Sequence, residues 1–160
     1  MTSNGLNPIR NNRILSDIKE LVRNDMPDII EKVEINEDIY KPHIIYMKGP
    51  VDTPYEGGIF KISMQMPADY PYKPPSMSFM TQVYHPNISR DGSICIDILK
   101  DQWSSVLRAT KVILSLSALL ANPNPDDPLV LETAREYRDD RKKYETNARE
   151  WVNKFAKANK

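Results

Sequence analysis

The sequence predicts an α+β fold, in which a four-stranded antiparallel β-meander is flanked by an N-terminal helix, a central helix and C-terminal helices. Near the N-terminus, apolar residues recur at helical spacing. From residue 29 to residue 79, strand-like segments are separated by compact turns. Beyond residue 108, apolar residues return to helical spacing, which indicates the central and C-terminal helices.

Length and composition fit one globular domain. The chain has 160 residues, 40% hydrophobic and 28% charged, so we expect one domain at 8–157 after a flexible lead at 1–7. Its 22 basic residues balance 22 acidic ones, which argues against a nucleic-acid partner. No apolar run has the roughly 18 residues of a membrane span or resembles a signal peptide. We therefore expect no membrane partner and a cytoplasmic or nuclear location.

The first helix is expected to begin at Asn7-Pro8, where asparagine suits the N-cap and proline the first helical position. Its opposite side is basic, and Arg10 and Arg13 are close enough in the helix to be neighbours. That side is either a solvated face or a docking surface. The expected apolar face consists of Ile14, Leu15, Ile18, Leu21 and Val22.

Four strand-like segments follow, at residues 30–35, 39–47, 58–66 and 77–80. Turn residues separate them, and short connections of this kind join antiparallel neighbours. The next segment, Tyr70 to Pro75, contains three prolines and cannot lie inside a helix or a central strand. One of its X-Pro bonds is a candidate for the cis form. The segment is either a rigid clamp at the end of the sheet or a binding loop.

Two helical regions complete the chain. Ala109 to Ala121 is apolar almost all round, which predicts a helix at the centre of the fold, and Asn122-Pro123 ends it. The last 30 residues predict one or two further helices. Their expected core-facing stripe consists of Ala148, Trp151, Val152 and Phe155.

The segment from Tyr84 to Leu99 is the first candidate for chemistry, because it holds the one cysteine, Cys95, and one of two histidines, His85. The Asp91-Gly92 turn precedes Cys95, so the cysteine should emerge beside a loop. A small buried apolar side chain is the alternative interpretation. One cysteine and two histidines cannot build a structural zinc site, and Cys95 has no protease signature around it.

Three motifs, in this order, resemble those of ubiquitin-conjugating enzymes: Tyr70 to Pro75, Tyr84 to Trp103, and Pro123 to Pro128. The resemblance extends over about residues 8–156. It implies the fold of that family, and a reaction in which Cys95 accepts ubiquitin from an activating enzyme as a thioester. A substrate lysine then receives the ubiquitin, usually with the help of a ubiquitin ligase. The resemblance implies no cofactor or metal, because the activating enzyme consumes the ATP.

Thioester transfer to an amine needs a donor to the developing oxyanion and a site where a lysine ammonium loses its proton. Asn87 can supply the donor, or can tie its own loop together. By the family motif, Asp127 orients the lysine and steers the proton, whereas Asp126 is solvated or capping. His85 and Pro86 are expected to have structural roles.

The resemblance also assigns binding residues. The basic first helix, with Arg10 and Arg13, is expected to dock the activating enzyme. Many relatives have Ser-Pro-Ala where this chain has Ser104-Ser105-Val106, so this loop is expected to be looser. The expected ligase contacts are Pro71, Tyr72, Ser104, Ser105 and Val106, and the expected neighbours of the thioester or the acceptor are Asp97, Leu107 and Asn124.

Two alternatives to this function stay open. A catalytically silent relative would work as a binding scaffold, but such relatives lack the cysteine that this chain retains as Cys95. A conjugating enzyme for a different ubiquitin-like modifier would have much the same motifs. A charging assay with a panel of modifiers would distinguish the second alternative.

Overall fold

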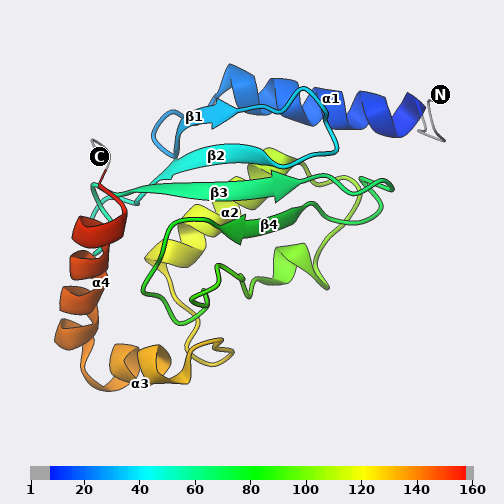
Figure 1. Cartoon of the computed structure of the whole chain (residues 1–160). Coiled ribbons are helices and arrows are strands. Elements are labelled where there is room, and N and C mark those ends of the chain that lie inside the picture. Colours follow the sequence, from blue (N-terminus) through cyan, green and yellow to red (C-terminus); the bar gives the residue numbers. More distant parts are fainter. Residues whose placement is uncertain (1–7, 158–160) are drawn as a thin grey trace.

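The computed structural model describes residues 8–157, with side chains from Asn12 onward (Figure 1). The predicted lead at 1–7 and the predicted Asn7 cap lie outside the described residues. The elements follow in the order α1 (Pro8–Arg23), β1 (Ile30–Glu34), β2 (His43–Lys48), β3 (Ile59–Gln65), β4 (Ser76–Phe79), the 3-10 helix η1 (Asp97–Leu99), α2 (Ala109–Ala121), α3 (Leu131–Asp139) and α4 (Arg141–Phe155).

The four strands form one antiparallel sheet in the order β1-β2-β3-β4, which confirms the predicted meander. Alternate residues of β2 and β3 are buried, so one face of the sheet contributes to the core. β2 begins at His43 instead of residue 39, because the preceding residues turn around Asp38. The side chain of Asp38 accepts from the amide of Tyr40, and its carbonyl accepts from the amide of Lys41.

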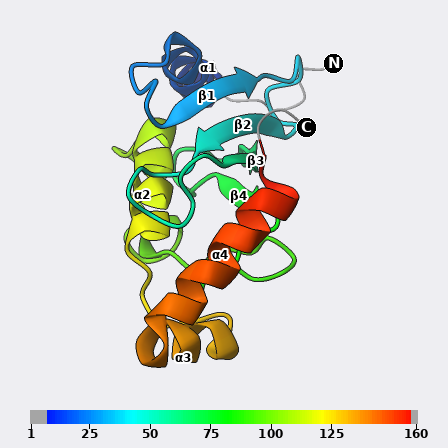
Figure 2. The same ribbon diagram turned by 90° about the vertical axis from the view of Figure 1, so that its left-hand side faces the viewer.

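Helix α2 covers one face of the sheet, while α1 lies beyond β1 and α3 and α4 lie at one end of the molecule (Figures 1 and 2). The predicted bounds of α2 are confirmed. Five of its apolar residues are buried, as expected for a central helix, although Leu114 faces outward at 41% exposure. Among residues 8–157, no helix is both long enough and apolar enough to cross a membrane.

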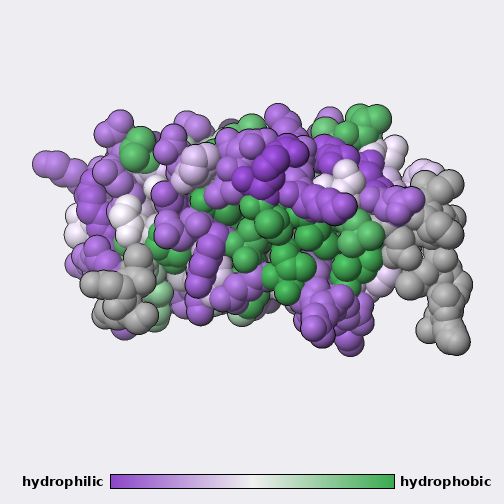
Figure 3. Space-filling view, turned by 90° about the horizontal axis from the view of Figure 1, so that it is seen from above, coloured by the Kyte–Doolittle hydropathy of each residue, from purple (hydrophilic) through white to green (hydrophobic). Residues whose placement is uncertain are grey.

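The buried face of α1 is narrower than predicted. Ile14, Ile18 and Leu21 follow one stripe and are buried, but Leu15 and Val22 are 41% and 58% exposed. Leu15 and Val22 are seven residues apart, so they lie together on the flank of that stripe. Figure 3 shows hydrophobic surface among polar side chains on the side of the molecule where α1 lies.

The C-terminal region forms two helices, within the predicted range. In the predicted stripe of α4, Ala148 and Val152 are buried, but Phe155 is 42% exposed. The Trp151 ring is half-buried against Tyr84, with the ring centroids 5.3 Å apart. Helix α4 therefore packs against the start of the segment that contains the sole cysteine.

Candidate active site

Cys95 lies on an irregular segment between β4 and η1, as the sequence predicts (Figure 1). Its side chain is half-buried, and its amide donates to the carbonyl of Asn87 at 2.9 Å. The turn before it depends on Gly92, which has a positive φ of 91°. A Cβ atom on Gly92 would lie 2.0 Å from the carbonyl oxygen of Phe79, so this turn requires glycine.

Asp127 is the closest carboxylate partner described for this sulfur. The Cys95 thiol donates to Oδ2 of Asp127 at 3.4 Å, although the two residues are 32 positions apart. The carboxylate is exposed, so an incoming amine could reach it from solvent. The structure therefore brings together the two side chains to which the sequence assigns the chemistry.

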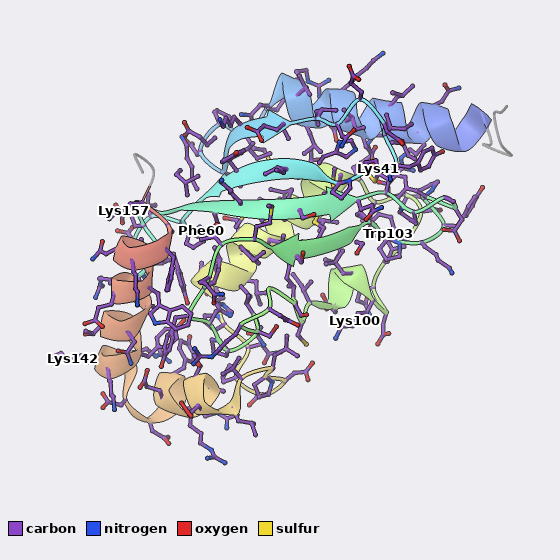
Figure 4. All side chains as sticks on the ribbon, in the orientation of Figure 1. Lys41, Phe60, Lys100, Trp103, Lys142 and Lys157 are labelled. Atoms are coloured by element: carbon purple, nitrogen blue, oxygen red, sulfur yellow. The ribbon has the colours of Figure 1, made fainter. Side chains whose placement is uncertain are left out.

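Sequence reasoning missed Lys100, whose Nζ lies 3.4 Å from Sγ of Cys95 and donates to it. Lys100 follows η1, and its amide donates to the carbonyl of Asp97 at 2.9 Å. This turn brings the chain back toward the sulfur, and Figure 4 shows Lys100 beside η1. The sequence shows a lysine five residues after the cysteine, but this spacing predicts a contact only when the turn between the two residues is known.

Asn87 holds the loop that carries Asp127. Its buried side-chain amide donates to the carbonyls of Asn124, at 2.9 Å, and Asp127, at 3.0 Å. Its Oδ1 accepts from the amide of Asn124 at 2.8 Å. Both amide hydrogens are thus committed to loop carbonyls, which favours the loop-holding alternative. Donation to an oxyanion stays a prediction, and it would require one of these hydrogens to change partner.

His85 supports the same loop from inside the core. Its Nδ1 accepts from the amide of Asn87 at 3.0 Å, so Nε2 carries the proton and donates to the carbonyl of Leu119 at 2.8 Å. Burial lowers the pKa of His85 to about 4, against a smaller opposing effect of the Leu119 hydrogen bond. The carbonyl of buried Pro86 accepts from the amides of Leu129 and Val130. These contacts fit the structural roles predicted for His85 and Pro86.

Two of the remaining candidates near the acceptor site, Asp97 and Asn124, form backbone hydrogen bonds that shape the site. Asp97 begins η1 with an exposed side chain, and its carbonyl accepts from the amide of Lys100. Exposed Asn124 exchanges two hydrogen bonds with Asn87 through its backbone. Asp126 forms a surface ion pair with Arg138 and is 82% exposed, which fits the predicted solvated role. No cluster that could hold a metal ion occurs in the described part of the chain.

Two of the side chains predicted to contact a ligase are apolar and exposed. Tyr72 is 72% exposed and Val106 is 78% exposed. Their loops are joined, because Nε1 of Trp103 donates to the carbonyl of Pro71 at 2.9 Å. The bond between Tyr70 and Pro71 is cis, which confirms that part of the prediction. Within the second loop, Oγ of Ser104 accepts from the amide of Val106 at 3.4 Å.

Arg13 is largely enclosed by the protein itself, which argues against the solvated-face alternative and leaves docking of the activating enzyme as a prediction. Its side chain is only 19% exposed, and its guanidinium donates to the carbonyls of Ser105, at 2.6 Å, and Leu107. Its Nε also pairs with buried Asp17 at 3.2 Å. The Ser105 loop is therefore tethered to α1. That it is looser than a loop with proline at position 105 stays a prediction. Arg10 lies on the same helix, but its side chain lies outside the described ones.

Comparisons with known proteins agree with this geometry. The sequence model of a family described as "Ubiquitin-conjugating enzyme" matches residues 13–152. The E2 domain of a Toxoplasma gondii ubiquitin conjugating enzyme is 36% identical, with a TM-score of 0.83, over 92% of this chain and 99% of that one. A Plasmodium yoelii structure described as a ubiquitin conjugating enzyme is 35% identical, with a TM-score of 0.86, over 95% of this chain and 98% of that one. The chain therefore belongs to the ubiquitin-conjugating enzyme family, whose members are transferases that carry ubiquitin as a thioester on a cysteine.

Proposed function

We propose that Cys95 is the residue that carries ubiquitin and that Asp127 prepares the substrate lysine. The observation that supports this proposal is the 3.4 Å contact between Sγ of Cys95 and Oδ2 of Asp127. Cys95 is the only cysteine in the chain, so a thioester carried by a cysteine has no other place to form.

The transfer step needs both side chains. A neutral lysine amine attacks the thioester carbon, a carbon–nitrogen bond forms, and the carbon–sulfur bond breaks to release the thiolate of Cys95. Before the attack, the lysine ammonium gives up one proton to become the neutral amine, and a carboxylate beside the sulfur can hold the ammonium in place and accept that proton. As the amide forms, the nitrogen loses a second proton, which the departing thiolate takes up. The contact between Asp127 and the sulfur of Cys95 supports this role for Asp127.

Asn87 has a positioning role in this proposal. Its three side-chain hydrogen bonds fix the backbones of Asn124 and Asp127. Because these bonds lie in a buried environment, their geometry is held firmly. The carboxylate of Asp127 therefore stays near the sulfur instead of following a mobile surface loop.

The partners proposed here follow from the family. An activating enzyme supplies ubiquitin, consumes the ATP and docks near α1, while a ubiquitin ligase docks on the surface that includes Tyr72 and Val106. The substrate is a lysine of another protein, and this chain uses no cofactor. We place the reaction in the cytoplasm or the nucleus, where activating enzyme and ATP are both present.

The test is a charging assay with activating enzyme, ATP and ubiquitin. The wild-type protein should form an adduct that a thiol reductant removes, and Cys95→Ser should form at most an oxyester that resists the reductant. Cys95→Ala should form neither. A reducible adduct on Cys95→Ala would refute the assignment.

A panel of other ubiquitin-like modifiers, each with its own activating enzyme, tests the choice of modifier. We expect ubiquitin to charge Cys95 most efficiently. Preferential charging by another modifier would contradict the ubiquitin assignment while keeping the thioester chemistry.

A further inference from the structure

We propose that Ser105 is a site of phosphorylation, and that its phosphate is bound by Arg13 and Arg108 and blocks the ligase surface. Ser105 is half-buried in the loop between η1 and α2, and its neighbours Ser104 and Val106 are exposed. The hydroxyl of Ser105 has no hydrogen-bond partner among the described residues. The part of the inference that concerns the ligase rests on the proposed function.

Two guanidinium groups lie beside this loop. Arg13 donates to the carbonyl of Ser105 at 2.6 Å, so the hydroxyl of the same residue is only a few bonds away from that guanidinium. The Nε atoms of Arg13 and Arg108 both contact Oδ1 of Asp17, at 3.2 and 2.9 Å, which brings the two cations together. Glu20 lies 3.5 Å from Nε of Arg108 and offsets part of their charge, but Arg13 shares its only carboxylate partner among the described residues. The pair can therefore attract a further anion.

Arg13 has donors left for such an anion. Its guanidinium uses three N–H groups for Asp17 and for the carbonyls of Ser105 and Leu107, and its other N–H groups have no partner among the described residues. The side chain of Arg108 is 34% exposed, so a phosphate at the surface can reach it. A phosphoserine beside arginines forms about one to three charge-assisted hydrogen bonds.

The modification needs a protein kinase and ATP. Oγ of Ser105 attacks the γ-phosphorus of ATP, a new oxygen–phosphorus bond forms, and the bond from that phosphorus to the departing ADP oxygen breaks. The hydroxyl proton passes to a base of the kinase, and the products are phosphoserine and ADP. The segment from Lys100 to Arg108 contains no helix or strand, which makes it accessible to a kinase.

A phosphate at this position opposes ligase docking. It carries a charge of about −1.5 to −2 at pH 7, next to Val106, whose side chain is 78% exposed and is a predicted ligase contact. A ligase that packs on Val106 would have to desolvate this charge, which costs free energy. None of the hydrogen bonds described for Cys95 and Asp127 involves residues 104–106. Phosphorylation of Ser105 therefore switches off the ligase step and does not act on the thioester directly.

The first experiment measures whether the arginines bind the phosphate. Phosphoserine is incorporated at position 105 by nonsense suppression, and its second pKa, ordinarily about 6, is measured by phosphorus NMR. We expect a pKa of about 5, because nearby guanidinium groups stabilise the dianion. Arg13→Ala should raise this pKa toward about 6, and so should Arg108→Gln, at the more exposed of the two arginines.

Phosphoserine at position 104 is the matched control. The hydroxyl of Ser104 accepts from the amide of Val106, so it is engaged within its own loop. The second pKa of a phosphate there should stay at about 6. Equal pKa values at positions 104 and 105, or an unchanged value in both folded arginine variants, would overturn binding of the phosphate by Arg13 and Arg108.

The second experiment measures the ligase step. The phosphorylated protein is charged first, so that differences in charging do not enter, and discharge to lysine is followed with and without an isolated ligase domain that stimulates the unmodified protein. The ratio of the two rates should fall at least ~10-fold on phosphorylation of Ser105, and phosphatase treatment should restore it. An unchanged ratio would contradict the role as a switch.

Modification in the cell is tested on protein recovered from its own cells with phosphatase inhibitors present. Mass spectrometry should map a phosphate to Ser105, and an unmodified Ser105 would overturn the assignment as a phosphorylation site. The NMR measurement needs no ubiquitin, so it tests the phosphate site even if no reducible adduct forms and the proposed function is wrong. If the adduct forms but the pKa and the rate ratio both stay unchanged, the thioester assignment stands and the role of Ser105 is wrong.

Discussion

The guanidinium of Arg13 donates a hydrogen bond to the carbonyl of Ser105 at 2.6 Å, across 92 positions of sequence. The same side chain pairs with Asp17, whose carboxyl is fully buried and also pairs with Arg108 at 2.9 Å. One residue of α1 thus holds the loop on which a ligase is expected to dock. The surfaces proposed for the activating enzyme and for the ligase are therefore physically connected.

Arg13→Ala should destabilise the protein and loosen this loop. Two backbone carbonyls would lose their donor, and buried Asp17 would keep only one of its two arginines. We expect the free energy of unfolding to fall by about 1–3 kcal/mol, as measured by urea denaturation. Lys19→Ala, at an exposed position on the same helix, should change it by less than about 0.5 kcal/mol.

In the Arg13→Ala variant, the ligase-stimulated rate of discharge to lysine should fall by a larger factor than the rate without ligase. Ser105→Pro should partly restore stimulation in the Arg13→Ala background, because a compatible proline restricts the loop by itself. In the wild-type background, the gain should be small, since Arg13 already holds the loop. Slower charging of Arg13→Ala with unchanged stability would instead favour a direct docking role for Arg13.

Asn87→Ala should slow discharge to lysine far more than discharge to hydroxylamine. If Asn87 acts by holding Asp127, its loss slows discharge to lysine, because that reaction depends on the carboxylate. The double variant Asn87→Ala, Asp127→Asn should then discharge to lysine no more slowly than the slower of the two single variants. If Asn87 is an oxyanion donor, both nucleophiles should slow by ~10²-fold or more. Single-turnover discharge with each nucleophile separates the two roles, and charging provides the control for folding.

Asp127→Asn should affect lysine in a way that depends on pH. Free lysine has a pKa near ~10.4, so at neutral pH only about one molecule in ~10³ is the reactive amine. Discharge to lysine should therefore fall sharply near pH 7 and recover in part toward pH 10, while discharge to neutral hydroxylamine should change little. Equal losses for both nucleophiles at every pH would show that Asp127 only shapes the loop.

His85 should make the stability of the protein depend on pH. Its pKa is lowered to about 4 in the folded protein by burial, whereas an unfolded histidine titrates near ~6.5. Between these values, the unfolded chain binds more protons, so acidification should destabilise the fold. The expected loss is about 2 kcal/mol from pH 7 to pH 5. Urea denaturation of the wild-type protein and His85→Gln should give curves against pH that converge on acidification, and parallel curves would contradict this prediction.

The sequence predicted the elements better than it predicted their contacts. The apolar pattern of Ala109–Ala121 defined α2 correctly, because a helix buried on most sides leaves an unambiguous signal. The start of β2 was wrong, because the hydrogen bonds of Asp38 to the following amides compete with strand pairing. Leu15 and Val22 were assigned to the buried face of α1, since helical spacing cannot show where a neighbouring element ends.

The candidate site shows the same limit. Asp127 could be placed near Cys95 only through the family motifs, because no local pattern joins residues 32 positions apart. The sequence placed Arg13 on the basic side of the first helix. No local pattern shows that its guanidinium donates hydrogen bonds to two carbonyls of the Ser105 loop. The sequence did not predict that Lys100 contacts the sulfur, because this contact depends on the turn at η1.

Trp103 gives this enzyme an optical reporter at its proposed ligase surface. The indole donates to the carbonyl of Pro71 and lies 5.9 Å, between ring centroids, from Tyr70, so it senses both loops at once. The chain has only one other tryptophan, Trp151, which lies on α4 beside Tyr84. With Trp151 replaced by phenylalanine, the tryptophan fluorescence of this chain comes from Trp103 alone. A ligase that covers the loops then dehydrates the half-buried indole and moves its emission to shorter wavelength, so binding can be followed without attaching any dye.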